Sequence, residues 1–193
     1  MSYFERETRE LVSLDSCELI RSQFDLVTDF QGAVALDYFA EIADQLLPPA
    51  EPNERFFRLL LAVLDSVREG GTAAVPRAVN YFSLWAVRLS GWLPDLHVCL
   101  GCGSVLDDPE QPERAFFTRG QAGLACAECR RALGGGNSWE LSAESRALAA
   151  EMLRRPVGQI PAAAAATDLR RFLVQQIESH VERKLITAPL LET

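Results

Sequence analysis

The sequence lacks the long apolar stretches that would place it in a membrane or on a secretory route. Its longest apolar run, residues 56–67, is interrupted by Arg58 and Asp65 and is shorter than the roughly 20 residues that a membrane-spanning helix needs. The first twenty residues carry acidic side chains where a signal peptide has a basic stretch followed by an apolar one. We therefore expect a cytoplasmic protein.

Basic residues are also too few for a protein that binds nucleic acid over its whole surface. The 193 residues include 19 Lys and Arg against 27 Asp and Glu, which gives a net charge of −8. All of this excess lies in residues 1–70, where 14 acids face 6 bases, whereas residues 71–193 have 13 of each. Any contact with a phosphate backbone must therefore come from a local basic face.

The residue patterns of common catalytic sites are missing as well. We find no Ser/His/Asp or Cys/His arrangement, no paired-carboxylate site and no Gly-rich phosphate loop. Of the two histidines, His97 is expected to lie beside the metal site or at the surface, and His180 to pack half-buried on the last helix. We expect no enzymatic activity, and a metalloenzyme is the more remote alternative.

What the sequence does contain is two Cys-x-x-Cys pairs, Cys99-Leu-Gly-Cys102 and Cys126-Ala-Glu-Cys129, with 23 residues between the inner cysteines. Each short turn can direct both sulfurs to one point, so the two pairs can surround one ion as a tetrahedron. Four thiolates fill the coordination shell and leave no position for a substrate. The pattern therefore predicts one structural Zn²⁺ held by these cysteines in a zinc ribbon.

Two alternatives for these cysteines are a redox dithiol and a pair of disulfides. A thioredoxin-like dithiol needs a βαβ unit, and none surrounds either pair.

Gly101 and Gly103 flank Cys102, where we expect the tight turn to require positive φ. The fifth cysteine, Cys17, is expected to be a buried structural thiol.

Helical periodicity dominates the sequence outside the ribbon. Five segments are expected to be helices: residues 30–46 after the N-cap Asp29, 54–70 after the N-cap Asn53, 76–89, 142–153, and 167–185 with Thr167 as the N-cap. The 54–70 segment is apolar nearly all round, which predicts the buried central helix. Short strands are expected between residues 3 and 14 and over 114–120.

The fold class that follows is mainly α: a helical bundle with an inserted four-cysteine zinc ribbon and a short N-terminal β remnant. We expect the hairpin in residues 1–24, the helical domain in residues 25–96 and 138–193, and the zinc ribbon insert in residues 97–137.

The order of these features resembles the RecO family of bacterial DNA repair and recombination mediators. The segment Leu89-Ser-Gly91-Trp92-Leu-Pro94 runs directly into the first cysteine pair, and Phe116-Phe117 and Gly123 precede the second pair. Residues 169–185 are similar to the closing helix of that family. Residues 5–20 are similar to the last strand of its N-terminal oligonucleotide-binding (OB) fold. Because the family begins with a complete five-stranded barrel, the chain is expected to be a truncated member.

The resemblance implies a cytoplasmic, nucleoid-associated mediator that binds single-stranded DNA and anneals complementary strands. With RecR, such a mediator helps to load RecA onto DNA coated by single-stranded-DNA-binding protein. In that family the helical domain holds the acidic, Phe-ending tail of the coating protein in an apolar groove with basic rims. Arg77 and Arg88 are the candidates for that rim here.

Six arginines are candidates for contact with DNA, because guanidinium groups suit phosphate. They are Arg114, Arg119, Arg130 and Arg131 around the ribbon, and Arg170 and Arg171 on the last helix. The alternative is that they balance acidic residues in a solvated module. A zinc-ribbon scaffold that binds only proteins is the alternative function, since it would bind the tail peptide without single-stranded DNA.

Overall fold

The computed structural model describes residues 2–5, 12–49, 51–107, 114–132, 137–161 and 166–192. The helices are α1 (Phe30–Leu46), α2 (Glu54–Gly70), α3 (Val75–Leu89), α4 (Ala127–Ala132), α5 (Ala143–Met152) and α6 (Thr167–His180). The strands are β1 (Ser2–Phe4), β2 (Ser13–Ser16), β3 (Ala115–Thr118) and β4 (Ser138–Leu141). Short 3-10 turns are η1 (Phe24–Thr28), η2 (Gly71–Ala74), η3 (Val157–Gln159) and η4 (Ala188–Glu192).

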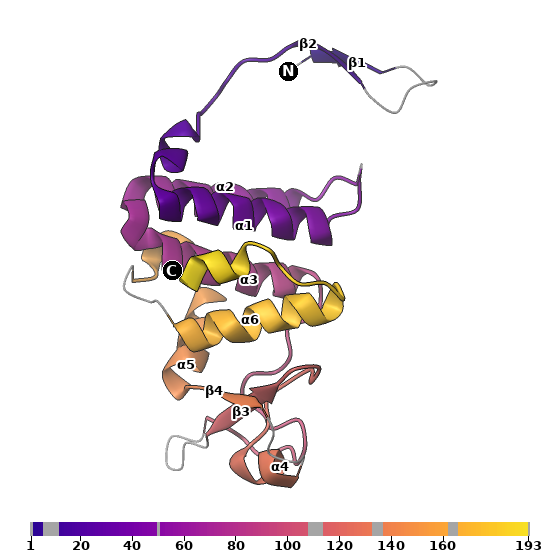
Figure 1. Ribbon diagram of the computed structural model, residues 1–193, viewed down its shortest axis with the longest axis vertical. Coiled ribbons are helices and arrows are strands. Elements are labelled where there is room, and N and C mark those ends of the chain that lie inside the picture. Colours follow the sequence, from indigo (N-terminus) through magenta and orange to yellow (C-terminus); the bar gives the residue numbers. More distant parts are fainter. Residues whose placement is uncertain are drawn as a thin grey trace.

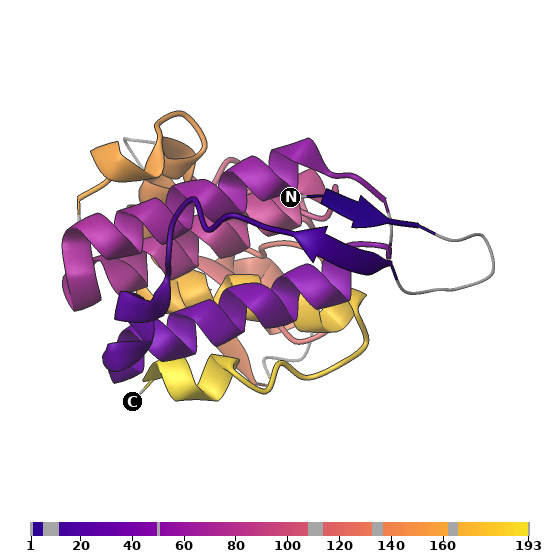
Figure 2. The ribbon, with the colours of Figure 1, turned by 90° about the horizontal axis from the view of Figure 1, so that it is seen from above.

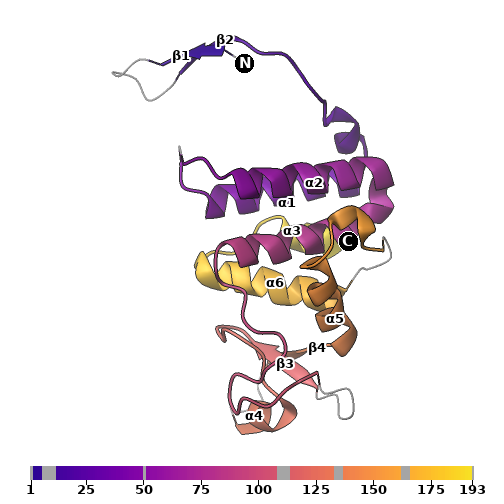
Figure 3. The ribbon, with the colours of Figure 1, turned by 180° about the vertical axis from the view of Figure 1, so that it is seen from behind.

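The molecule is elongated, with the helical bundle between the β1–β2 hairpin and the ribbon (Figure 1). The view from behind shows the same order, with α1 and α2 on the hairpin side and α6 and α5 on the ribbon side (Figure 3). This arrangement confirms the predicted fold class, a mainly α bundle that carries a four-cysteine ribbon and an N-terminal hairpin.

Local sequence signals place the helix boundaries. The Asp29 carboxylate accepts a hydrogen bond from the Gly32 backbone N–H at 2.9 Å, and the Asn53 side chain accepts one from Phe56 at 3.0 Å. These side chains satisfy amide groups that have no partner inside the helix. Gly71 ends α2 with a φ of 60°. The predicted caps of the first two helices are therefore confirmed.

The central helix is α3 rather than the predicted α2. Most of α3 is buried, because it packs against α1, α2, α5 and α6. In α2, by contrast, Phe57 and Leu61 are 58% and 43% exposed. Apolar residues of α2 thus lie on its exposed face as well as on its buried face. An apolar sequence around the whole helix therefore did not make the whole helix buried.

The last helix is shorter than predicted. It ends at His180, and Glu182 then takes a φ of 54°, which turns the chain back. The returning segment lies against α1, where the Glu41 carboxylate accepts from the backbone N–H groups of Ile186 and Thr187 at 2.7 and 2.9 Å. At the start of this helix the N-cap position falls on Ala166, so the predicted cap at Thr167 is wrong.

The N-terminal strands pair antiparallel, with Tyr3 opposite Leu14, as the sequence predicted. Seen from above, the hairpin lies on the outer side of α1 and α2 (Figure 2). Cys17, just after β2, is exposed, which contradicts its predicted burial. The reason is that the strand before it pairs with β1 but buries no side chain, since every residue of β2 is exposed. No helix in the part of the chain described is long and apolar enough to cross a bilayer.

Candidate metal centre and basic groove

Four sulfur atoms converge at the far end of the ribbon. The Sγ atoms of Cys99, Cys102, Cys126 and Cys129 all lie within 4.8 Å of one another. The Cys102 and Cys126 sulfurs are 3.8 Å apart, too far for a disulfide. A tetrahedral ion with metal–sulfur bonds of about 2.3 Å would hold its sulfurs about 3.8 Å apart. The cluster therefore has the dimensions of a four-thiolate metal site.

The backbone around the cysteines fixes this geometry. In the first turn, the Cys99 N–H donates to the Ser104 carbonyl at 2.8 Å, and Gly103 has the predicted positive φ, 75°. Gly101 is needed for another reason: a Cβ there would come within 2.8 Å of the Cys129 sulfur. The Cys126 N–H donates to the Cys99 sulfur at 3.2 Å and so links the two turns.

The surroundings of the thiols explain why the cluster suits a cation. Burial of Cys99 opposes its ionisation, but backbone donors, led by Cys126, outweigh it and lower its pKa to about 6. The neighbouring thiols of Cys102, Cys99 and Cys126 raise the pKa of Cys129 to about 12. Four thiolates so close together repel one another, and a bound cation removes that repulsion.

The ribbon is attached to the bundle by a second strand that the sequence analysis missed. The sequence predicts strand β3 but assigns residues 138–141, which form β4, to the helical domain. Strand β4 pairs with β3, Phe117 facing Trp139, and Phe117 packs edge-on against Phe172 of α6 at 5.2 Å. Strand β4 has four residues, of which Leu141 is buried. Such a short segment shows too little alternation of apolar and polar side chains to predict a strand.

Arg146 of α5 also connects the ribbon to the helical bundle through hydrogen bonds. It is 1% exposed, and it donates to the backbone carbonyls of Leu106 and Leu141 at 3.0 and 2.9 Å and to the Asp107 carboxylate at 2.7 Å. Asp107 also bonds His97, an exposed residue outside the sulfur cluster. One buried guanidinium thus ties the first cysteine turn and β4 to the bundle.

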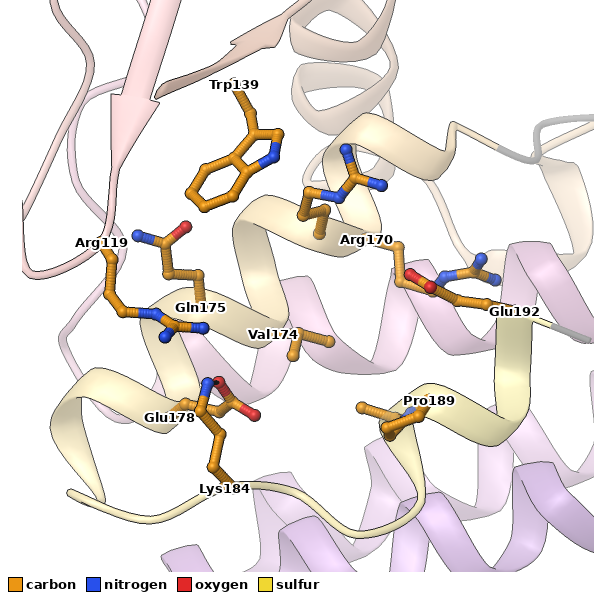
Figure 4. A pocket seen from close by; sticks show the side chains of 11 residues that line it. Arg119, Trp139, Arg170, Val174, Gln175, Glu178, Lys184, Pro189 and Glu192 are labelled. Atoms are coloured by element: carbon orange, nitrogen blue, oxygen red, sulfur yellow. Dashed lines mark hydrogen bonds and ion pairs between the residues drawn. The ribbon is translucent and has the colours of Figure 1, made fainter. Parts of the chain in front are cut away.

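A basic groove runs between the ribbon and the end of the chain (Figure 4). It brings together three of the six predicted DNA-contacting residues, Arg119, Arg170 and Arg171. The other residues that line it are Trp139, Val174, Gln175, Glu178, Lys184, Ala188, Pro189 and Glu192. Figure 4 shows Arg119 and Trp139 projecting from the ribbon toward α6, so both modules contribute walls.

The chain is similar to known proteins along most of its length. The model of the family "Recombination protein O C terminal" matches residues 27–187. The chain belongs to the RecO family. It is 45% identical to the DNA repair protein RecO of Koribacter versatilis (strain Ellin345) over 98% of this chain and 75% of that protein. It is 32% identical to the DNA repair protein RecO of Anaeromyxobacter sp. (strain K) over 97% of this chain and 72% of that protein.

The chain is thus a RecO-family DNA repair protein, and its other predicted DNA contacts lie outside the groove. Arg114 pairs with Glu140, with its Nε 3.1 Å from the carboxylate. The guanidinium of Arg130 lies 4.3 Å from the centre of the Phe116 ring. Arg131 bonds its own helix at the Ala127 carbonyl. The structure therefore divides the six arginines into two groups.

The two predicted rim residues of this RecO-family chain also separate. Arg77 is buried, and its guanidinium donates to the Ser66 hydroxyl and the Ile160 carbonyl, both at 2.8 Å. It is therefore not available at the surface. Arg88 is exposed and lies beside Leu93 and His97, in a different hollow from the one between α2 and α3.

A half-apolar pocket lies between α2 and α3, and sequence analysis did not find it. Its lining residues are Arg55, Arg58, Leu59, Ala62, Tyr81, Trp85 and Leu89. The Tyr81 hydroxyl donates to the Arg155 carbonyl at 3.2 Å and the Trp85 indole to the Met152 carbonyl at 3.1 Å. These bonds fix the two rings, while both arginines are exposed at the rim. The i, i+4 spacing of Tyr81 and Trp85 was the available signal.

Proposed function

We propose that this chain is a non-enzymatic recombination mediator that binds single-stranded DNA in the basic groove. With RecR as its partner, it would promote strand annealing and RecA loading on DNA coated by single-stranded-DNA-binding protein, at the nucleoid in the cytoplasm. The observation that carries the proposal is the gathering of Arg119, Arg170 and Arg171 around Trp139. Basic residues together with an aromatic ring are what single strands require of a binding surface.

The charges in the groove support a phosphate ligand. Arg119, Arg170 and Arg171 form no ion pair with any described residue, unlike Arg114. Two carboxylates line the groove. That of Glu178 is already engaged, because it pairs with Lys184 and accepts from the Leu185 N–H at 3.2 Å, and that of Glu192 forms no ion pair with a described residue. The guanidinium groups therefore remain available for phosphate oxygens.

We propose Zn²⁺ as the ion of the sulfur cluster. Four thiolates in a tetrahedral arrangement select a soft cation, and zinc is the common occupant of such sites. With all four positions taken by Cys99, Cys102, Cys126 and Cys129, the ion would stabilise the ribbon without acting on a substrate. In this way it would hold Arg119 and Trp139 in the groove.

Reversing two groove charges tests DNA binding. The double variant Arg170→Glu/Arg171→Glu is expected to bind a single-stranded oligonucleotide at least about tenfold more weakly at low salt. The slope of log affinity against log salt should also fall by about 1.4, because each lost phosphate contact removes about 0.7. Fluorescence anisotropy over a salt series measures both quantities.

Arg154→Glu/Arg155→Glu is the charge-matched control for that experiment, since both arginines are exposed and neither lines the groove. If Arg170→Glu/Arg171→Glu bound DNA with unchanged affinity and slope, the groove would not be the DNA site. Tail-peptide binding without any affinity of the wild-type chain for single-stranded DNA would instead support the protein-only scaffold.

We propose that the pocket between α2 and α3 receives the acidic, Phe-ending tail of single-stranded-DNA-binding protein. Leu59, Tyr81 and Trp85 offer an apolar floor for the terminal ring, and Arg55 and Arg58 can face the acidic residues. The pairing of Arg58 with Glu54 does not prevent this, because both side chains are 74% exposed and such pairs are weak. These two arginines replace the predicted Arg77 in the proposed rim.

The variant Arg55→Glu/Arg58→Glu is therefore expected to bind an acidic nonapeptide ending in Phe about tenfold more weakly, because attraction at the rim becomes repulsion. Isothermal titration calorimetry measures the affinity, and Arg88→Glu serves as the comparison. A larger loss in Arg88→Glu than in the double variant would move the tail to the hollow beside Leu93.

A further inference from the structure

One polar group in the groove is buried without a partner. Gln175 of α6 is only 7% exposed, and its Nε2 has no hydrogen-bond acceptor among the residues described. The residue lines both the groove and the adjoining hollow next to Gly120 and Arg183. In Figure 4 its amide lies between the Trp139 ring and the Arg119 side chain, with the amide oxygen on the side of Trp139. A buried amide donor without an acceptor costs free energy that a ligand with an acceptor would recover.

The ring of Trp139 next to this amide is held in place. It is half-buried and packs against its cross-strand partner Phe117, with the ring centres 5.9 Å apart. Phe117 is fully buried and in turn contacts Phe172, so the indole has a rigid support. Trp139 also lines the groove. A fixed ring open on one side is a platform on which an unstacked base can lie.

We propose that Trp139 and Gln175 together bind one unstacked base of single-stranded DNA. The base lies against the indole, its edge accepts a hydrogen bond from Gln175 Nε2, and the adjacent phosphate meets Arg119. This inference rests on the proposed DNA-binding function and deepens it. It assigns the contact to the bases, whereas the arginines alone would bind any polyanion.

The chemistry of the amide predicts that the base is required but its identity is not. A carboxamide has both a donor and an acceptor, and each of the four bases presents acceptors on its edge. The groove volume of about 260 Å³ is slightly smaller than the roughly 300–1,000 Å³ of typical ligand pockets. It therefore suits one base and not a stacked run.

The test compares a fluorescent 15-nucleotide thymidine strand with an abasic strand of the same length and charge. The wild-type chain is expected to bind the abasic strand about tenfold more weakly, because base–aromatic stacking is lost. Trp139→Leu should bind both strands alike, while Trp139→Phe should restore most of the preference. Gln175→Leu should weaken binding of the thymidine strand severalfold and leave binding of the abasic strand unchanged. The four homopolymers should agree within about threefold for the wild type.

Retained metal content and an unchanged melting temperature establish that each variant is folded. Equal affinity of the wild type for the thymidine and abasic strands would overturn the inference, while the charge-reversal result at Arg170 and Arg171 would still decide the proposed function separately. If the acidic peptide competed for the groove and its affinity fell in Trp139→Leu, the pocket would be a peptide site and the inference would also be overturned.

Discussion

Removal of the metal is expected to unfold the ribbon and abolish binding in the groove. Outside the sulfur cluster, the described residues of the ribbon include few large buried side chains, chiefly Leu106, Phe116, Phe117 and Leu124. This is too little apolar area to fold a segment of this size alone. Structural zinc contributes apparent binding free energies of about 10–16 kcal/mol in small zinc-finger peptides. Loss of that contribution exceeds what this small core can replace.

Cys126→Ser is the variant that tests this expectation, because Cys126 is buried and bonded to its neighbours. Elemental analysis should find one zinc per wild-type chain and none in the variant. Limited proteolysis should then cleave between residues 97 and 141 while the helical core survives. Cys17→Ser is the control, since that thiol is exposed and lies outside the cluster. A zinc-free chain that kept an intact ribbon would contradict the structural role of the metal.

Arg146→Met is expected to destabilise the protein by about 2–4 kcal/mol, because two backbone carbonyls lose their donors, while the partly exposed Asp107 carboxylate can be hydrated. The substitution leaves the Asp107 carboxylate without its 2.7 Å partner and removes the donors from the carbonyls of Leu106 and Leu141. Urea denaturation followed by circular dichroism measures the change. Arg154→Met is the control, because Arg154 is exposed and should alter stability by less than about 0.5 kcal/mol.

The Arg146 pair also predicts a dependence on pH. Burial of Asp107 opposes ionisation, but hydrogen bonds from His97 and Arg146 outweigh it, so the pKa of this carboxyl lies below its ordinary value. A lowered pKa stabilises the folded state above the unfolded pKa of about 3.9, and this stabilisation is lost as pH falls through the folded pKa. The difference in stability between the wild type and Arg146→Met should therefore shrink below about pH 4. A difference that grew on acidification would contradict the pairing.

Features set by neighbours in the sequence could be predicted. The spacing of the cysteine pairs brought Cys99 and Cys126 into one cluster, and Asp29 and Asn53 cap their helices as expected. Each helix cap and each Cys-x-x-Cys turn depends on a few consecutive residues, whose geometry is nearly independent of the rest of the fold. The two turns, although 23 residues apart, could be paired because one tetrahedral ion needs the four sulfurs of both.

Features set by tertiary packing could not be predicted. Trp139 and Gln175 are 36 positions apart in the sequence. They line the same groove only because β4 pairs with β3 and lies against α6. The family resemblance made Arg77 a candidate for the basic rim, but Arg77 is buried because its partners Ser66 and Ile160 come from other elements. The same limit applies to the DNA arginines, since nothing in their local sequence separates Arg119 from Arg114.

The shared walls of the groove affect how dissection experiments are to be understood. Arg119 and Trp139 come from the cysteine-bearing module, whereas Arg170 and Gln175 come from the helix beneath it. Neither piece, expressed separately, would carry the complete cleft, because the ring of Trp139 lies on one piece and the amide of Gln175 lies on the other. Negative binding results from such fragments would report the loss of their junction and would say nothing against the intact molecule.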